Sequence, residues 1–178
     1  MTERKFEPGD LPQVMAVYHD AVHTLAAPFY AKEQLDSWAP PDAKMDRWKE
    51  RLAPLQTILT EHEGLVAGFA SYNTAGHLDL LFVDPRFARR GVATRLCSWV
   101  ENELRAGGVS RIFTEASLAA RSFFERIGFR VVAEETVECR GSHLRRYAME
   151  KIITSPNHST EPTAASGTSA AGHPPRQP

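Results

Sequence analysis

The spacing of apolar residues changes near Pro54 from a helical period to a strand period. Before this point apolar residues recur every three or four positions, as at Met45, Trp48 and Leu52, which predicts amphipathic helices. After it, short apolar runs end at glycine-containing turns, which predicts strands. We expect helices at about 10–28, 31–37 and 41–54, strands at 56–61, 65–72 and 77–83, a helix at 91–107, a strand at 111–115, a helix at 118–127, and strands at 129–137 and 143–152. This order predicts a layered α/β domain around a mixed sheet.

The composition changes again after Ile153. Residues 154–178 contain five prolines and no Val, Ile, Leu, Met, Phe, Trp or Tyr. A segment of this kind cannot bury enough apolar surface to offset the conformational entropy that it would lose on ordering. We therefore predict a folded domain at 1–153 and a disordered C-terminal tail at 154–178, dispensable for folding and for ligand binding.

The charge and the cysteine content exclude several classes of protein. The chain has 21 basic and 22 acidic residues and a net charge of −1, which argues against bulk electrostatic binding of nucleic acid or of an anionic membrane. Cys97 and Cys139 show no disulfide or metal-ligand spacing, so we expect neither a disulfide scaffold nor a metal site. No apolar run has the length of a signal peptide or a membrane span, so we expect a cytoplasmic protein.

A strand, a basic loop, a glycine and a helix follow one another between Leu80 and Leu96. A helix N-terminus offers unpaired N–H groups and a partial positive charge, and Gly91 lets the backbone approach an anion closely. The segment therefore predicts phosphate binding, with a solvated basic loop as the alternative. It has neither the GxxxxGK pattern of a P-loop nor the GxGxxG pattern of dinucleotide-binding folds. Four arginines add positive charge around the same point: Arg86, Arg89, Arg90 and Arg95.

Two motifs in the chain resemble those of the GNAT superfamily of N-acetyltransferases. The first is a strand ending in Val-x-Pro and then Gln/Arg-x-x-Gly-x-Gly/Ala, which residues 88–93 match as Ala-Arg-Arg-Gly-Val-Ala. The second is Asn-x-x-Ala-x-x-x-Tyr-x-x-x-Gly-Phe, which residues 117–129 match with Ser, Ala, Phe, Gly and Phe at the defined positions. The resemblance extends over residues 56–151, and residues 30–38 resemble a poorly characterised bacterial branch of the family.

The sequence departs from these motifs at three positions. Ala88 stands where the loop motif has Gln or Arg, but the family's phosphate contacts come mainly from backbone N–H groups, so we expect the site to persist. Ser117 replaces the Asn and retains the ability to form hydrogen bonds. Phe124 replaces the Tyr whose hydroxyl protonates the departing thiolate in many relatives, so we expect the thiolate to leave without a side-chain acid at this position.

The resemblance implies a mixed, mostly antiparallel central sheet, flanked by helices on both faces and splayed between the strand ending at Val83 and the strand at 111–115. It also implies that acetyl-CoA binds in the opening, with its pantetheine against the backbone of the first strand and its pyrophosphate on the glycine loop. Phe124 either contacts this cofactor or packs in the core. The cofactor-binding residues implied are Leu81, Phe82, Val83, Arg89, Arg90, Gly91, Val92, Ala93, Thr94, Ser117 and Phe124.

The resemblance further implies transfer of the acetyl group to an amine, which must first lose a proton. A lysine-like amine has a pKa of about 10.4, so a base is needed near neutral pH. His77, Asp79 and Glu115 are the candidates, acting directly or through water. The alternative for His77 and Asp79, two apart on one strand, is a structural hydrogen-bonded pair; a metal site would need a third ligand that the sequence does not show.

The acceptor site is expected in the segment before the sheet. Tyr30, Gln34 and Trp38 recur every four residues, so on one helix they share a face that either lines the acceptor pocket or packs on the sheet. The acceptor is expected to be a small-molecule or peptide amine. Similar folds commonly form dimers, so a homodimer is one of the expected oligomeric states. Two alternatives to an enzyme are a non-catalytic acyl-CoA-binding regulatory module and an unrelated nucleotide-binding domain.

Overall fold

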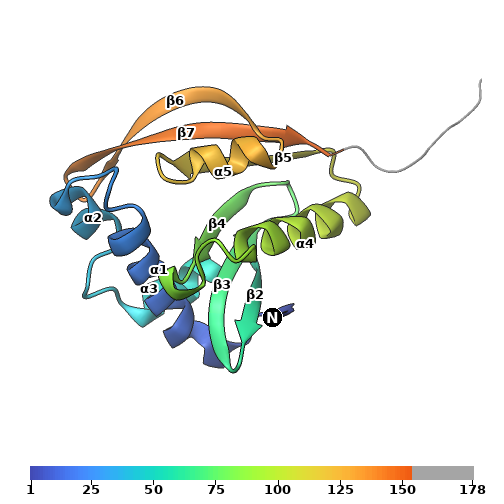
Figure 1. Cartoon of the computed structure of the whole chain (residues 1–178), viewed down its shortest axis with the longest axis horizontal. Coiled ribbons are helices and arrows are strands. Elements are labelled where there is room, and N and C mark those ends of the chain that lie inside the picture. Colours follow the sequence, from blue (N-terminus) through green and yellow to red (C-terminus); the bar gives the residue numbers. More distant parts are fainter. Residues whose placement is uncertain (154–178) are drawn as a thin grey trace, which may run out of the picture.

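The structure is a computed structural model that describes residues 1–153; the predicted tail at 154–178 lies outside the described residues. The elements in chain order are β1 (Thr2–Lys5), η1 (Pro8–Asp10), α1 (Leu11–Leu25), α2 (Lys32–Trp38), α3 (Met45–Leu52), β2 (Gln56–His62), β3 (Leu65–Tyr72), β4 (Leu78–Val83), η2 (Pro85–Phe87), α4 (Val92–Ala106), β5 (Arg111–Ser117), α5 (Arg121–Arg126), β6 (Arg130–Cys139) and β7 (Ser142–Ile152) (Figure 1). In this part of the chain no helix is both long and apolar enough to cross a membrane.

The strands form two antiparallel sheets that meet at one point. One sheet has the order β1-β2-β3-β4 and the other the order β5-β7-β6. A parallel bridge joins His77, just before β4, to Phe113 in β5, and the Thr114 hydroxyl donates a hydrogen bond of 2.8 Å to the Leu78 carbonyl. Beyond these contacts β4 and β5 belong to separate sheets. The predicted mixed sheet, splayed between these two strands, is confirmed.

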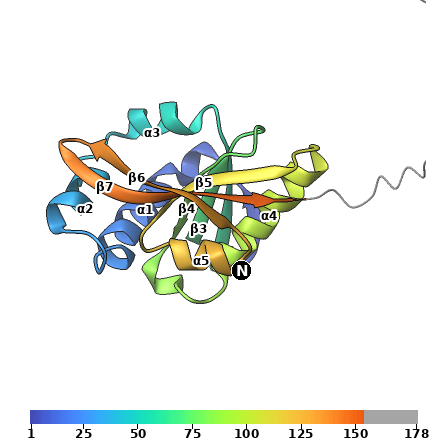
Figure 2. The ribbon, with the colours of Figure 1, turned by 90° about the horizontal axis from the view of Figure 1, so that it is seen from above.

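Helices cover both faces of the first sheet, as predicted. On one face, α1 packs on β3 and β4, and α3 packs on α1, in a core that includes Val14, Trp48 and Phe69. On the other, α4 packs on β2, β3 and β4 through a core that includes Leu96 and Val100. Viewed from above, α3 and α5 lie on opposite sides of the strands (Figure 2). Each helix therefore presents one apolar stripe to the sheet, as its sequence period requires.

The β6–β7 hairpin arches over the molecule and reaches α2 at its far end (Figure 1). The side-chain amide of Gln34 donates to the carbonyl of His143 at 2.7 Å, and the hydroxyls of Ser37 and Ser142 lie 2.8 Å apart. The hairpin turns at Arg140-Gly141, with φ of +47° and +82°. These contacts tie the tip of the hairpin to α2.

Two elements differ from the expectation. The sequence analysis did not predict β1, because its four residues show no apolar alternation; an ion pair of 2.8 Å between Arg4 and Glu61 accompanies its pairing with β2. The helix expected at 118–127 begins only at Arg121. Its delay follows from the Ala120 N–H, which donates to both the carbonyl and the hydroxyl of Ser117 and so closes a turn after β5.

Candidate active site

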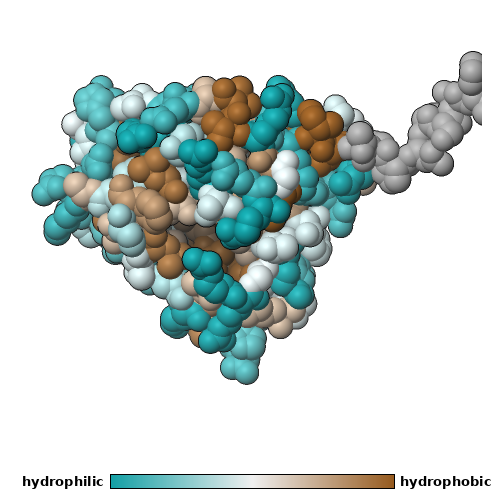
Figure 3. All heavy atoms as spheres, turned by 45° about the horizontal axis from the view of Figure 1, so that its top comes forward, coloured by the Kyte–Doolittle hydropathy of each residue, from teal (hydrophilic) through white to brown (hydrophobic). Residues whose placement is uncertain are grey.

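A cavity of about 640 Å³ lies between the helices at the front of the chain, the diverging strands β4 and β5, and the β6–β7 hairpin. Figure 3 shows hydrophobic residues gathered in a recess on this side of the molecule, with hydrophilic residues around it. The volume is in the range that takes a small ligand. The lining residues are Tyr18, Tyr30, Trp38, Pro40, Ala43, Arg47, Trp48, Arg51, Asp79, Leu80, Phe82, Glu115, Ser117, Val137, Glu138, Cys139, Arg140, Leu144, Arg145 and Arg146.

Glu115 and Asp79 face this cavity from the two strands that diverge. Glu115 Oε2 lies 2.7 Å from His77 Nε2, and the His77 ring stacks on Phe113 with 4.8 Å between ring centroids. Asp79 Oδ2 accepts a hydrogen bond of 3.4 Å from Arg51. The structure therefore brings all three predicted base candidates to one place, but with His77 paired to Glu115 rather than to Asp79.

A β-bulge determines how Asp79 reaches the cavity. Ser71 of β3 lies opposite Leu80, and the next residue, Tyr72, lies opposite Leu78, so Asp79 is the extra residue of β4. A bulge locally re-aims a side chain and interrupts the alternation of a strand. In a strand without a bulge, the side chains of His77 and Asp79 would point to the same face of the sheet. Instead Asp79 lines the cavity, whereas His77 is not among the lining residues and contacts Glu115, which is.

The N-terminus of α4 has the features of an anion site. Gly91 at the N-cap has φ +81°, Arg89 before it has φ +62°, and the first turn has neither a side-chain cap nor an acidic residue. The first N–H groups of an α-helix have no partner within the helix, so those of the first turn, Val92, Ala93 and Thr94, remain able to bind an anion.

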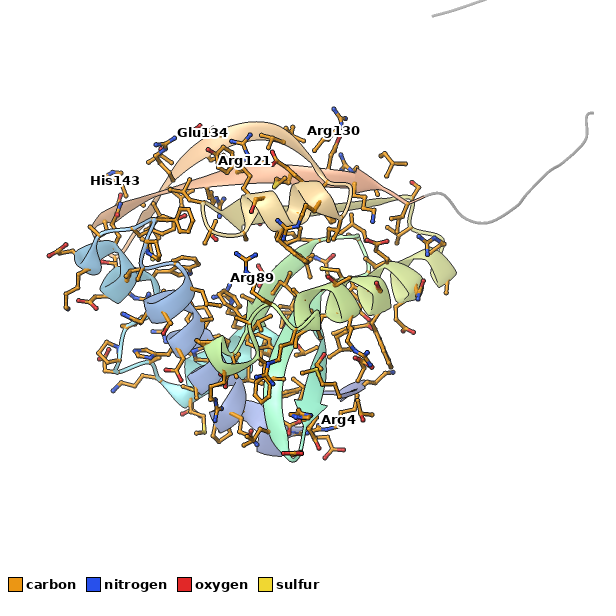
Figure 4. All side chains as sticks on the ribbon, in the orientation of Figure 1. Arg4, Arg89, Arg121, Arg130, Glu134 and His143 are labelled. Atoms are coloured by element: carbon orange, nitrogen blue, oxygen red, sulfur yellow. The ribbon has the colours of Figure 1, made fainter. Side chains whose placement is uncertain are left out.

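The four arginines of this loop divide into two pairs. Arg86 is bound by Asp84, and Arg95 donates to Glu3, so both are already neutralised. Arg89 and Arg90 are exposed and have no ion pair among residues 1–153. Figure 4 shows Arg89 in the opening between α5 and the lower half of the molecule. Arg89 and Arg90 therefore supply the free positive charge of the loop.

Coenzyme A would fit the chain's own groups at this edge. The uncapped turn of α4 matches a pyrophosphate, and β4 from Leu81 to Val83 is only partly buried and pairs with β3 alone. Gly68 of β3 allows Val92 at the start of α4 and the backbone of β4 to lie close to β3. A Cβ at this position would lie 2.7 Å from Val92 Cγ1 and 2.8 Å from the Phe82 carbonyl oxygen. The sequence analysis did not identify Gly68; a glycine inside an apolar strand was its signal.

Ser117 and Phe124 have different surroundings. Ser117 lines the cavity at the end of β5. Phe124 is 2% exposed and packs edge-on against Phe123 and Phe129, with ring centroids 5.3 and 5.0 Å away. It is not among the residues that line the cavity, so its surroundings are those of a core aromatic. A contact between Phe124 and the cofactor stays a prediction.

Of the three predicted acceptor residues, Tyr30 and Trp38 line the cavity and Gln34 does not. The Tyr30 hydroxyl donates to the Arg145 carbonyl at 2.7 Å and accepts from the Leu118 N–H at 2.9 Å. The side-chain oxygen of Gln34 accepts from the Ala31 N–H at 2.8 Å at the start of α2. Tyr30 precedes α2, so the three residues do not share one helix.

Burial changes the acidity of the tyrosines in the wall. It raises the pKa of Tyr18 to about 12, and it also raises the pKa of Tyr30. The Tyr18 hydroxyl donates to the Trp38 carbonyl at 2.9 Å. Both hydroxyls are therefore engaged and weakly acidic, and they hold the cavity wall together.

Sequence reasoning missed the basic part of the cavity, which consists of Arg47, Arg51, Arg140, Arg145 and Arg146. These arginines lie on α3 and on the β6–β7 hairpin, which are far apart in the sequence. No local motif connects them, so only the arch of the hairpin over α2 and α3 reveals the cluster. Among the described residues, no group of three or more His, Cys, Asp or Glu side chains is arranged to hold a metal ion.

Comparisons with known proteins agree with this geometry. The family of the acetyltransferase (GNAT) domain matches residues 26–151. The uncharacterized N-acetyltransferase YafP of Escherichia coli (strain K12) is 37% identical over 147 residues, which cover 82% of this chain and 92% of YafP. A GCN5-related N-acetyltransferase structure from Rhodopseudomonas palustris, titled as a class-II aminotransferase, has a TM-score of 0.82 and 28% identity, covering 85% of this chain and 95% of that one. The PaiA N-acetyltransferase of Thermoplasma acidophilum, solved in complex with coenzyme A, has a TM-score of 0.67 and 18% identity, covering 85% and 98%. The chain belongs to the GNAT family of acetyltransferases and is an acyltransferase.

Proposed function

We propose that the protein transfers the acetyl group of acetyl-CoA to a primary amine of a small molecule or a peptide. One observation carries the proposal: Asp79 and Glu115 face a common cavity from two strands that diverge, and β4 leads into the uncapped N-terminus of α4. The family resemblance implies that the donor binds in this opening, and PaiA, which shares the fold, was solved with coenzyme A. Bound acetyl-CoA supplies an acetyl thioester, and the chain supplies the groups that hold it and prepare the amine.

The donor is held by backbone groups and by the free arginines of the loop. The N–H groups of Val92, Ala93 and Thr94 would take the pyrophosphate, with Arg89 and Arg90 beside it. The backbone of Leu81, Phe82 and Val83 would pair with the extended pantetheine. A backbone N–H at this edge would also polarise the thioester carbonyl, a contact typically worth about 2.7–4 kcal/mol in the transition state.

Glu115 is the residue that we assign as the proton acceptor. It lines the cavity, and its second contact, with His77 at 2.7 Å, fixes the orientation of the carboxylate. His77 is a positioning residue, itself held flat against Phe113. Asp79 is held by Arg51 and contributes negative charge that favours an ammonium ion in the cavity.

No side-chain acid is assigned to the thiolate. Phe124 has no hydroxyl, and the hydroxyls of Tyr18 and Tyr30 are engaged with backbone groups. A thiol with a pKa of about 8.5 is a good leaving group near neutral pH, whereas the amine lies about three pKa units from its reactive form if it resembles lysine. Deprotonation of the amine is therefore expected to limit the rate, which should rise with pH.

Phe124 also keeps a second function open: an acyl-CoA-binding module that regulates a partner without catalysis. The test is release of free thiol from acetyl-CoA across a panel of amines, together with calorimetric titration of coenzyme A. Glu115→Gln should lower kcat/KM by roughly a hundredfold or more while coenzyme A affinity stays unchanged. Glu125→Gln, an exposed change on α5, is the matched control. Tight coenzyme A binding without amine-dependent thiol release would favour the second function.

A further inference from the structure

The cavity carries more positive than negative side chains. Arginines outnumber acidic residues in its lining, and most of these charges have partners. Arg51 binds Asp79, and the guanidinium groups of Arg145 and Arg146 pair with Glu134 and Glu135 of β6 at 2.7 and 2.9 Å.

Arg47 and Arg140 have no acidic partner among residues 1–153. Arg47 is exposed on α3. Arg140 lies in the β6–β7 turn, where only its Nη1 atom has acceptors, the Ser37 carbonyl at 2.7 Å and Cys139 Sγ at 4.0 Å. Most N–H groups of these two side chains therefore remain able to bind an anion from outside the chain.

The same two arginines mark the mouth of the cavity. A smaller hollow of about 400 Å³ adjoins the main cavity, and both are lined by Pro40, Ala43, Arg47, Trp48 and Arg140. Arg47 and Arg140 come from different elements and meet at this junction, so a ligand in the main cavity has two guanidinium groups at its outer end.

Arg140 holds this place at a conformational cost. It has φ +47°, in the left-handed region that favours Asn or Gly, and it precedes Gly141 at φ +82° in a two-residue hairpin turn. An Asn-Gly sequence would suit such a turn better than Arg-Gly. The turn geometry therefore does not explain the presence of arginine here.

The wall between the two charged ends is apolar and aromatic. Trp48 is 6% exposed and packs edge-on against Tyr18, with 4.8 Å between ring centroids. Phe82 contacts both Tyr18 and Trp38, at 4.7 and 6.3 Å. The cavity thus offers the carboxylates of Asp79 and Glu115 on one side, guanidinium groups at the mouth, and an aromatic surface between them. A third carboxylate, Glu138, lines it from β6 near the hairpin turn.

From these observations we infer that the acceptor is an amine that also carries a carboxylate on an apolar or aromatic body. Its ammonium group lies toward Glu115 and Asp79, and its carboxylate binds Arg47 and Arg140. The inference rests on the proposed function for the amine's fate, but not for its binding. A bidentate pair of guanidinium and carboxylate has the geometry and strength to select such a molecule.

The test is calorimetric binding of matched acceptors to the full chain in the presence of coenzyme A. 4-(Aminomethyl)benzoate is compared with 4-methylbenzylamine, and 3-(aminomethyl)benzoate with 3-methylbenzylamine; in each acid the ring separates the ammonium from the carboxylate, and in each amine a methyl group replaces the carboxylate. We expect at least one acid to bind about tenfold or more tightly than its counterpart without the carboxylate. Equal affinities within both pairs would overturn the inference. A short peptide ending in phenylalanine distinguishes a peptide carboxyl terminus from a free amino acid.

The variants separate recognition from folding. Arg140→Asn creates an Asn-Gly turn, which should offset the loss of the hydrogen bond to the Ser37 carbonyl, so the melting temperature should change little while the affinity for the acid falls about tenfold. Arg47→Gln should act in the same direction, whereas Arg126→Gln, an exposed change on α5, should not. A preference for acids that survives the double change of Arg47 and Arg140 would sink the assignment.

The outcome for binding is independent of the outcome for catalysis. Acids that bind through Arg47 and Arg140 but release no thiol from acetyl-CoA would keep this inference and contradict the proposed acetyl transfer. Thiol release that is equally fast with acids and with their counterparts without the carboxylate, at equal affinity, would keep the transfer and contradict the inference.

Discussion

At the scale of single residues, Gly91 has a backbone conformation that suits the phosphate binding we propose at the N-terminus of α4. Its φ of +81° is strained for most side chains, yet a Cβ built there meets no atom within 4 Å. Space is therefore open in front of the α4 N-terminus, and a substituted side chain would stand where we propose the pyrophosphate to bind.

Substitution of Gly91 by Asn and by Asp isolates the effect of charge, because both residues tolerate the left-handed region and have the same shape. We expect Gly91→Asp to weaken coenzyme A binding at least tenfold, or about 1.4 kcal/mol, by repulsion between the carboxylate and the phosphates. Gly91→Asn should lose clearly less. Calorimetric titration of both variants gives the comparison, and equal affinities would place the phosphates elsewhere.

The residues that sequence reasoning found are those with local signals. Gly91 opens a helix, Asp79 is the one acidic residue of an otherwise apolar strand, and Glu115 is the one acidic residue of β5. Arg47 and Arg140 have no such signal, since each looks like an ordinary surface arginine. Their shared position depends on long-range folding that a single sequence does not encode in any local pattern.

At the scale of elements, the turn from β4 to α4 depends on Asp84. Its side chain accepts hydrogen bonds from the Arg86 N–H at 2.8 Å and from the Arg86 guanidinium, and it is 3% exposed. The guanidinium is the main reason that the pKa of Asp84 lies below its ordinary value, and the backbone N–H adds to this. The strand end that would hold the donor is thus fixed to the loop that would bind its phosphates.

We expect Asp84→Asn to destabilise the fold by about 1–3 kcal/mol at pH 7. Because the folded pKa is depressed, the wild-type carboxylate contributes fully above the unfolded value of about 3.9, and its contribution is lost as the pH falls through the lower folded value. The gap between variant and wild type should therefore narrow below about pH 4. Denaturant unfolding from pH 3 to 7 measures it. Asp46→Asn, exposed on α3, is the control; a constant gap would contradict the ionic role.

Elements were predictable where an apolar period ran without interruption. The helices α1, α3 and α4 and the strands β2, β3 and β4 fall where the period places them. The strand β1 has only polar and charged side chains, so its sequence does not indicate a strand; only the structure shows its pairing with β2. The bulge at Asp79 was equally hidden, because it depends on the register between two strands.

At the scale of the whole molecule, a few contacts hold the two sheets in their diverging arrangement. Tyr30 bonds to β7 and to the turn after β5, while the bridge between His77 and Phe113 joins the sheets at the other end. Tyr30 also lines the cavity, so one of these contacts forms part of its wall. The sequence analysis expected the splay from the family resemblance. The hydrogen bonds of Tyr30 to Arg145 and Leu118 could not be predicted, because they join residues far apart in the sequence.

Ile153, the last residue that the structure describes, is part of the hydrophobic core. Ile153 is 2% exposed in the core beside α4, and its N–H donates to the Ser110 carbonyl at 2.8 Å, which secures the end of β7 against the start of β5. Ile152, its neighbour, is 59% exposed. We propose that the folded domain ends at residue 153. A chain that ended two residues earlier would lose the buried side chain of Ile153 and should be less stable.

Two shortened chains test this boundary, one ending at Ile153 and one ending at Lys151. Removing a buried isoleucine typically costs about 2–5 kcal/mol, so we expect the shorter chain to melt about 5–15 °C below the longer one. The full chain carrying Ile153→Ala should show most of the same loss, which separates the buried side chain from the new chain end. Ile152→Ala is the matched control and should change the melting temperature little. Calorimetric melting of the four chains decides the matter: equal melting temperatures for the two shortened chains would mean that Ile153 contributes nothing to the core and that the domain ends earlier.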